Sequence, residues 1–263
     1  MSNKTHPFAS LNAFSTLLLD YLAAKPALQA FYGNAPQISH FKDQISKKKS
    51  FPSSSRAILQ TVLTEQYAAI GAEMPAVDLR DENTFTVTTG HQLNLYTGPL
   101  YVIYKLVSTI NLARALQKEY PNQRFVPVYW MATEDHDFKE INHFFAFGTK
   151  YTWNTPQKGA VGRFALSDFP KIPFRNEIFD KAYAEGKSLS EAVRIYMHAL
   201  FGAEGLLCLD ADDQRLKSIF APIMEADLTQ QVHEPIVRAT SEKLEALGYK
   251  TQVSARPVNL FQL

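Results

Sequence analysis

A strand–helix–strand pattern between residues 85 and 131 constrains the fold of this chain more than any other feature. Residues 85–89 are Phe-Thr-Val-Thr-Thr and residues 125–131 are Phe-Val-Pro-Val-Tyr-Trp-Met, both typical of strands. Between them, Gly98 and Pro99 suit a helix start, and apolar residues then fall on one helical stripe as far as Leu116. Two strands joined through a helix form a right-handed crossover and pair in parallel. The pattern therefore predicts an α/β fold built on an open parallel sheet, with a helix over 99–118.

Apolar runs and punctuation by glycine and proline divide the whole chain into four segments. We expect a helical segment packed on the core over residues 1–83 and a core with the site loops over 84–148. An inserted small β/turn segment is expected over 149–187. A continuation of the α/β core is expected over 188–263.

Shorter elements are expected within these segments. Residues 161–166, 206–210 and 251–254 have the composition of strands, and Ser188 with Glu191 forms a capping box for a helix ending at Gly202. Pro222 is expected to break or restart the helix that begins near Asp212. Pro127 removes a ladder donor from the run 125–131, which argues against a central position for that strand.

The sequence closes on an apolar, strand-like run, Val-Asn-Leu-Phe-Gln-Leu, at 258–263. Globular domains seldom finish on such a run without a polar tail. We expect either that this strand is the last of the sheet or that the sequence is a truncated piece of a longer core.

Composition excludes several classes of protein. The chain has 263 residues, 46% hydrophobic and 20% charged, which is ordinary for a soluble globular protein. Its net charge of +1 favours neither nucleic acid nor an anionic membrane as a partner. No run of 18 apolar residues predicts a membrane span, and the single Cys208 excludes an internal disulfide. A cytoplasmic location is the expectation that fits a reducing compartment.

Polar residues crowd the ends of both predicted strands. The first strand leads into Gly90, His91 and Gln92, and the second leads into an acidic run at 134–137. In an open α/β sheet the ligand crevice lies outside the carboxyl ends of the strands. We therefore expect the loops 90–98 and 132–137 to share one crevice that forms an active site.

The loop before Pro99 presents backbone N–H groups at a helix start, which suits an anion. Thr97 is a candidate cap for that helix, and His91 is a candidate phosphate ligand or acid–base group. Lys105 can reach back to an anionic substrate or can be an exposed helix lysine. The loop matches neither a Walker A loop nor a Gly-x-Gly-x-x-Gly fingerprint, and a purely structural loop is the alternative.

The acidic run Glu134-Asp135-His136-Asp137 places three carboxylates and one imidazole in four residues. With His143 it can form a metal site, a polar site for an amine and a ribose, or an acid-rich helix start without chemistry. Its spacing matches no metal signature, so no metal is predicted. Asp210, which follows the run 206–209, either faces the same crevice or caps the next helix. Trp130 either lines the crevice or packs at the strand end.

Several motifs carry a resemblance to a known family. They are Thr89-Gly90-x-Gln92, Leu95-x-Thr97-Gly98-Pro99 running on to Lys105, Trp130-x-Ala132-x-Glu134-Asp135-His136-Asp137 running on to Asn142-His143, Leu209-Asp210-x-Asp212-Asp213, and Val258-Asn259-Leu260-Phe261. From about residue 84 onward the chain resembles the bacillithiol-biosynthesis cysteine-adding enzymes, the BshC family.

The resemblance implies a Rossmann-like core with inserted connecting segments, akin to nucleotidylyl transferases and class I aminoacyl-tRNA synthetases. It implies a ligase that joins cysteine to glucosaminyl malate through an amide bond, with an activated carboxylate and with ATP or another nucleotide as cofactor. Family members are about twice this length and carry a coiled coil, which implies a homodimer. The other readings are a metal-dependent hydrolase and a non-catalytic, truncated binding domain.

Candidate roles follow from these patterns together with the resemblance. Family members more often carry glutamine where this chain has His91, so binding is expected of Gln92 and an obligatory catalytic role is not expected of His91. The expected catalytic residues are Asp135, His136 and Asp137. The expected substrate- or nucleotide-binding residues are Gly90, His91, Gln92, Thr97, Gly98, Lys105, Trp130, Glu134, Asn142 and Asp210.

Overall fold

A computed structural model describes residues 6–258. The chain divides into two compact units, one formed by 45–220 and the other by 6–44 together with 221–258. These bounds differ from the segments expected from the sequence. Residues 45–83 belong with the sheet because helix α3 (Ser53–Ala69) covers one of its faces, whereas 221–258 do not continue the α/β core.

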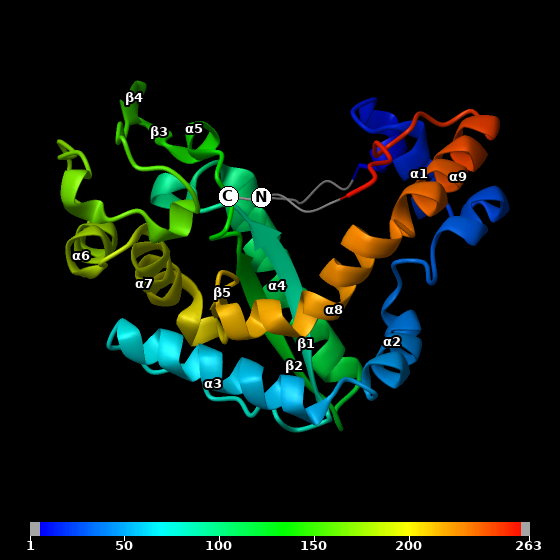
Figure 1. Ribbon diagram of the computed structural model, residues 1–263, viewed down its shortest axis with the longest axis horizontal. Helices are drawn as coiled ribbons and strands as arrows, with labels where there is room; N and C mark the ends of the chain where they lie inside the picture. Colours follow the sequence, from blue (N-terminus) through cyan, green and yellow to red (C-terminus); the bar gives the residue numbers. More distant parts are fainter. Residues whose placement is uncertain (1–5, 259–263) are drawn as a thin grey trace. The chain divides into compact units, whose positions relative to one another are not determined.

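The sheet of the larger unit has the strand order β1-β2-β5 and is parallel throughout (Figure 1). Its elements are β1 (Thr84–His91), helix α4 (Leu100–Glu119), β2 (Arg124–Met131) and β5 (Leu207–Asp210). Adjacent, parallel β1 and β2 with α4 between them in the chain confirm the predicted crossover. Every residue of β1 pairs with one of β2, from Thr84 opposite Arg124 to His91 opposite Met131.

Helices cover both faces of this sheet, which makes three layers. On one face Tyr129 and Met131 pack with residues of α4 and of α7 (Leu189–Phe201). On the other face Val126 and Val128 pack against Val62, Leu63 and Tyr67 of α3. Side chains of β2 thus alternate between the two faces of the sheet, with the period of two that a pleated strand imposes. A strand buried on both faces explains why 125–131 is an almost unbroken apolar run.

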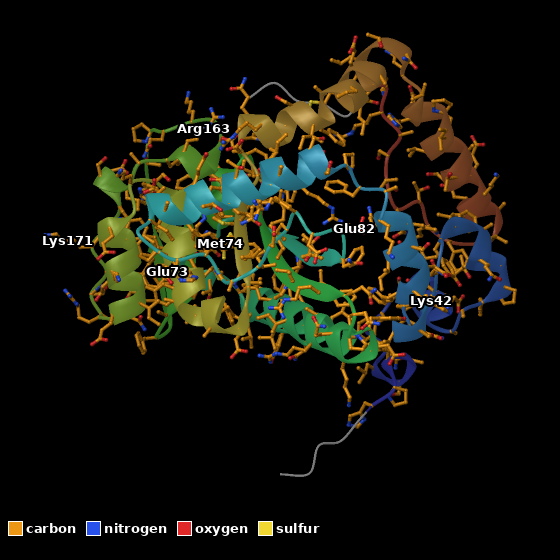
Figure 2. All side chains as sticks on the ribbon, turned by 90° about the horizontal axis from the view of Figure 1, so that it is seen from below. Lys42, Glu73, Met74, Glu82, Arg163 and Lys171 are labelled. Carbon is orange, nitrogen blue, oxygen red and sulfur yellow. The ribbon has the colours of Figure 1, made fainter. Side chains whose placement is uncertain are left out.

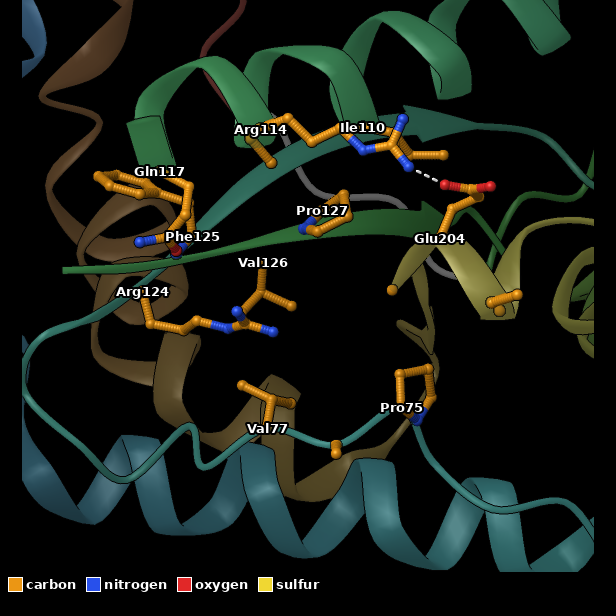
Figure 3. A pocket seen from close by; sticks show the side chains of 15 residues that line it. Pro75, Val77, Ile110, Arg114, Gln117, Arg124, Phe125, Val126, Pro127 and Glu204 are labelled. Atoms are coloured by element: carbon orange, nitrogen blue, oxygen red, sulfur yellow. Dashed lines mark hydrogen bonds and ion pairs between the residues drawn. The ribbon is translucent and has the colours of Figure 1, made fainter. Parts of the chain in front are cut away.

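The central strand of the sheet contains Pro127, contrary to the expectation from the sequence. β2 pairs with β1 along its whole length, but its pairing with β5 begins only at Val128 opposite Leu207. Pro127 therefore lies outside the β5 ladder, and the pairing with β1 continues past it. The space beside it is a cavity of about 380 Å³ at the amino end of the sheet, lined by Arg124, Val126 and Gly205 among others (Figure 3).

The region between the site loops and α7 contains an antiparallel hairpin and short helical turns. Its elements are α5 (Phe138–Ile141), β3 (His143–Ala146), β4 (Thr149–Thr152), η5 (Val161–Arg163), η6 (Leu166–Asp168) and α6 (Glu177–Glu185). The strand expected over 161–166 is wrong, because Val161 and Gly162 donate to the backbone of the acidic loop and not to a neighbouring strand. Ser188 caps α7 as predicted, with its hydroxyl accepting from the N–H of Glu191 at 3.3 Å.

The smaller unit consists mainly of helices. They are η1 (Phe8–Leu11), α1 (Thr16–Leu22), η2 (Pro26–Phe31), η3 (Ile38–His40), the larger part of α8 (Gln214–Gln230) and α9 (His233–Ala246), with α2 (Phe41–Lys48) at its border. Its packing includes the buried Asp20, which accepts from the Tyr249 hydroxyl at 2.8 Å and pairs with Lys25 at 2.9 Å.

Two sequence expectations fail in this part of the chain. Pro222 lies inside α8 and does not end it, because the loss of one N–H leaves the hydrogen bonds of the flanking residues in place. Residues 251–254 form no strand. The terminal strand expected at 258–263 lies, apart from its first residue, outside the described residues. Between residues 6 and 258, no helix is long and apolar enough to cross a membrane.

Candidate functional site

The two polar loops meet at the carboxyl ends of β1 and β2, as predicted. The amide nitrogen of Gln92 donates to the carboxylate of Asp135 at 2.8 Å and to that of Glu140 at 2.7 Å. The backbone joins the loops as well, since the N–H of Ala132 donates to the carbonyl of His91 at 3.1 Å. Because both neighbours of the Gln92 amide are carboxylates, its nitrogen must face them and its oxygen remains for another donor.

Backbone hydrogen bonds from η5 hold the acidic loop at Thr133, which is fully buried, and at Asp135. The N–H of Gly162 donates to the carbonyl of Thr133 at 2.9 Å, and the N–H of Val161 donates to the carbonyl of Asp135 at 2.8 Å. A Cβ on Gly162 would lie 2.6 Å from the Cβ of Thr133, so only glycine allows this approach. Segment η5 thus fixes the backbone from which Asp135 projects.

Asp210, at the end of β5, forms hydrogen bonds with the acidic loop, with α7 and with the segment that follows β5. Its carboxylate accepts from the hydroxyls of Thr133 and Ser190 and, at 2.9 Å, from the N–H of Asp212. Arg194, only 2% exposed, lies 4.0 Å from the same carboxylate and donates to Gln66 at 3.0 Å. Asp210 does not cap α8, which begins at Gln214; its carboxylate is instead bonded to groups of the protein, including the N–H of Asp212 before that helix.

A second charged cluster lies beside Asp210. Asp212, whose side chain is 7% exposed, is bound by Lys217 and by Arg163, the latter through contacts of 2.5 and 3.0 Å. Arg163 lies on η5 and is labelled in Figure 2. Burial raises the pKa of Asp212, but hydrogen bonds from Arg163 and Lys217 outweigh it, and the pKa lies below its ordinary value. The cluster anchors η5 to the segment after β5.

This lowered pKa predicts a pH-dependent contribution to stability. A carboxyl group whose pKa is lowered in the folded state stabilises the fold above its unfolded pKa, 3.8, and loses that contribution as pH falls through the folded value. We expect Asp212→Asn to be less stable than the parent near neutral pH. The gap between their thermal midpoints should close below about pH 4. A gap that stays constant between about pH 6 and about pH 3 would contradict this assignment.

The loop between β1 and α4 has an unusual backbone. Tyr96, Thr97 and Gly98 have φ values of 52°, 69° and 68° in succession, all in the left-handed region. Only glycine enters this region freely, and non-glycine residues held there are concentrated at functional sites. Gly98 is required for a second reason, since a Cβ on it would lie 2.4 Å from the Cβ of Asn94.

We expect Gly98→Ala to destabilise the protein, by about 1–3 kcal/mol, through strain at positive φ and the clash with Asn94. Gly148 provides a matched control, because its φ is 77° but nothing lies within 4 Å of its ideal Cβ. Gly148→Ala should therefore show the cost of φ alone. Urea denaturation of the two variants and the parent would separate the two effects. Equal losses in both variants would show that the contact with Asn94 contributes nothing.

The strained loop forms one wall of a cavity of about 710 Å³ beside Gln92. Tyr96 stacks on Phe144 with ring centroids 4.2 Å apart and lies 4.7 Å from Phe179. Thr97, Gly98 and Pro99 continue the wall to the N-terminus of α4, where Thr97 does not provide the expected cap; no side chain caps this helix. Its remaining lining is Asn94, Tyr101, Glu140, His143, Phe145, Ala146, Phe147 and Phe174.

Comparison with known proteins identifies the family. A family model described as "Bacillithiol biosynthesis BshC, N-terminal Rossmann-like domain" matches residues 3–263. The chain belongs to the BshC family. The Rossmann-like fold expected from the resemblance is thereby confirmed, in agreement with the parallel three-stranded sheet between helices.

Relatives within the BshC family match nearly the whole chain. A protein of Christiangramia forsetii named "Putative cysteine ligase BshC" is 40% identical over 279 residues, which cover 97% of this chain and 52% of the relative. Proteins with the same name from Flavobacterium psychrophilum and Cytophaga hutchinsonii are 42% and 40% identical, with 50% and 49% of their lengths covered. The chain therefore spans about half the length of these relatives.

The expected catalytic residues of this BshC family chain differ in their surroundings. Asp135 is partly buried; burial raises its pKa, but hydrogen bonds from the Asp137 N–H and Gln92 outweigh it and the pKa is lowered. His136 and Asp137 are exposed. Glu134 is half-buried, and burial raises its pKa. The motif thus combines an ionised carboxylate with a neighbouring carboxyl group that holds a proton more readily.

The remaining expected binding residues lie at the same edge of the sheet. The Nζ of Lys105 donates to the carbonyl of Gly90 at 2.5 Å. This bond holds the end of β1 and places a cation beside it. His91 is partly buried, with its Nε2 unpartnered among the described residues, and burial together with Lys105 lowers its pKa. Trp130 is 41% exposed beside Gly90. Asn142 lies within hydrogen-bonding distance of His143 at 3.0 Å and is not among the residues that line the cavity.

Sequence reasoning missed the residues that support the motif in this BshC family member. They are Gln66, Thr133, Gly162, Arg163, Ser190 and Lys217. All but Lys217, which lies five positions from Asp212, act on residues much farther away in the chain, and only the glycine between the short runs at 159–166 indicated a close approach. Within residues 6–258, no three His, Cys, Asp or Glu side chains gather in a way that could hold a metal ion, so nothing described favours the hydrolase reading.

Proposed function

We propose that this chain is the Rossmann-like part of a ligase that joins cysteine to glucosaminyl malate through an amide bond, in bacillithiol biosynthesis. The shared name of the relatives in the BshC family, "Putative cysteine ligase BshC", supports the reaction class. The observation that carries the proposal is the direct bond between Gln92 and Asp135, which joins the two family motifs at the carboxyl ends of β1 and β2. That edge is where open α/β sheets bind their ligands.

The chemistry fits the residues at this edge. The cysteine carboxylate must first carry a leaving group; the sugar amine then attacks its carbonyl carbon, the carbon–nitrogen bond forms, and the leaving group departs with the bonding electrons. The attacking amine must lose its proton before or during this step. Asp135, which shares the Gln92 amide nitrogen with Glu140, can help to orient the ammonium group, and the exposed imidazole of His136 can accept the proton as a general base. We assign Asp137 to the same catalytic group as Asp135 and His136.

Activation of the carboxylate requires a co-substrate, and ATP or another nucleotide is part of the proposal. Adenylate or acyl phosphate formation would supply the leaving group. No described Lys or Arg lines the aromatic cavity, so that cavity does not fit a triphosphate. The proposal therefore places the nucleotide outside the aromatic cavity. His91 at the end of β1 and Lys105 on α4, whose Nζ donates to the Gly90 carbonyl, are not among the residues that line this cavity.

The decisive experiment is an assay of the full-length protein with cysteine, glucosaminyl malate and ATP. The proposal predicts a cysteinyl product that forms only when all three are present, detected by mass spectrometry together with the nucleotide product. Omission of ATP tests the activation step separately from amide formation. Absence of product with all three components, from protein shown to be folded, would reject the proposed reaction.

A further inference from the structure

We propose that the aromatic cavity beside Gln92 binds the amino-sugar end of the acceptor substrate, with its ammonium group at Glu140. The proposal rests on the function proposed above and extends it, because it assigns one substrate to one defined space. The cavity measures about 710 Å³, which is within the usual range for sites of small organic ligands.

Rigid aromatic faces form the walls of this cavity. Tyr96 contacts Phe144, Phe179 and Tyr183, with ring centroids 4.2, 4.7 and 5.2 Å apart. The rings of Tyr101 and Phe147 stand at the rim and are 52% and 87% exposed. Flat, preformed rings suit the apolar C–H face of a sugar ring, and they also attract a neighbouring cation.

The polar side chains of the cavity include the acceptors of Glu140 and Gln92 together with groups that can both donate and accept, on Asn94, Thr97 and His143. Glu140 offers a carboxylate, and the side-chain oxygen of Gln92 is left without a partner among the described residues once its nitrogen has bonded two carboxylates. No described Lys or Arg lines the space. Such a set matches the donors of an ammonium group and of hydroxyls, and it disfavours a polyphosphate.

Another part of the cavity lining suits the other end of the same molecule. Pro99 and Tyr101 border the N-terminus of α4, a helix of 20 residues without a side-chain cap. The free N–H groups there favour a carboxylate. A ligand with an amine at one end and carboxylates at the other, as in an amino sugar joined to a hydroxy diacid, would satisfy both parts of the cavity at once.

The test compares matched pairs of variants in the full-length protein. Glu140→Gln removes one charge from the cavity, and Glu119→Gln removes one from the end of α4. Tyr101→Ala removes a ring from the rim, and Tyr104→Ala removes an exposed ring from the same helix outside the cavity. We expect Glu140→Gln to raise the KM for glucosaminyl malate about tenfold and Tyr101→Ala to raise it about fivefold. The KM for ATP and both control variants should be unchanged.

Direct binding provides a readout that needs no turnover. In calorimetric titrations without ATP, glucosamine should bind the parent more tightly than N-acetylglucosamine, and Glu140→Gln should abolish that preference. If the titrations succeed but no amide product forms, the proposed function fails and the cavity assignment stands. If the two cavity variants raise the KM for ATP and leave sugar binding intact, the cavity belongs to the nucleotide. Equal behaviour of cavity and control variants would also overturn the assignment.

Discussion

Asp135→Asn should reduce turnover of the full-length ligase by about a hundredfold or more, as loss of a preorganised electrostatic contact does in other enzymes. The variant removes the charge that Gln92 and the backbone N–H of Asp137 hold in place. His136→Ala should have a comparable effect through loss of a proton acceptor. Both variants should fold, because His136 is exposed and Asp135 only partly buried, and surface-like changes cost within about half a kcal/mol.

Rates and thermal midpoints of the two variants and the parent would decide the matter. Asp78→Asn is a suitable control, since Asp78 is an exposed carboxylate paired with Arg80 before β1. A large drop in the midpoint of both site variants would show that the motif is a structural hydrogen-bond network. Normal rates in folded variants would show that the acidic residues precede α5 without a role in catalysis, and the functional assignment would be wrong.

The second large effect concerns stability. Asp210→Ala should cost about 3–5 kcal/mol of folding free energy, because it leaves the buried guanidinium of Arg194 with only the neutral acceptors of Cys208 and Gln66. The hydroxyls of Thr133 and Ser190 lose their acceptor in the same variant. Denaturant titration of the protein would measure the loss.

Asp213→Ala is the matched control for this change. Asp213 follows the same strand, but its partner Arg215 is half-exposed and keeps Glu65 as a second partner. Its removal should cost less than about 1 kcal/mol. If Asp210→Ala kept the parent's stability and lost only substrate affinity, Asp210 would face the ligand and the structural role would be refuted.

The parts of the fold that could be predicted from sequence are those encoded by local periodicity. The alternation along β1, the apolar stripe of α4 and the continuous apolar run of β2 each depend on neighbours within a few positions. The crossover rule then fixed their parallel pairing. From that pairing it followed that the loops after the two strands lie together, which the bond between Gln92 and Asp135 confirms.

The remainder depends on contacts between distant parts of the chain. Residues 161–166 have the composition of a strand, but Gly162 is committed to the backbone of Thr133 instead. The bond between Thr133 and Asp210 joins residues 77 positions apart, and nothing in either local pattern announces it. The division into two units likewise escaped prediction, because amphipathic helices such as α3 and α9 do not specify in their own sequence which partner they cover.

The short reach of β5 has a further consequence for motion. β5 pairs with four residues of β2, Val128 to Met131, all at the end that carries the site loops. The opposite end of the sheet is two strands wide and borders the cavity beside Pro127. Local opening is easiest where backbone hydrogen bonds have fewest neighbours. Amide hydrogen exchange should therefore be slowest for β2 residues near Met131 and faster near Arg124. The sheet would then open locally at the end near Arg124 while the site loops at the other end stay in place.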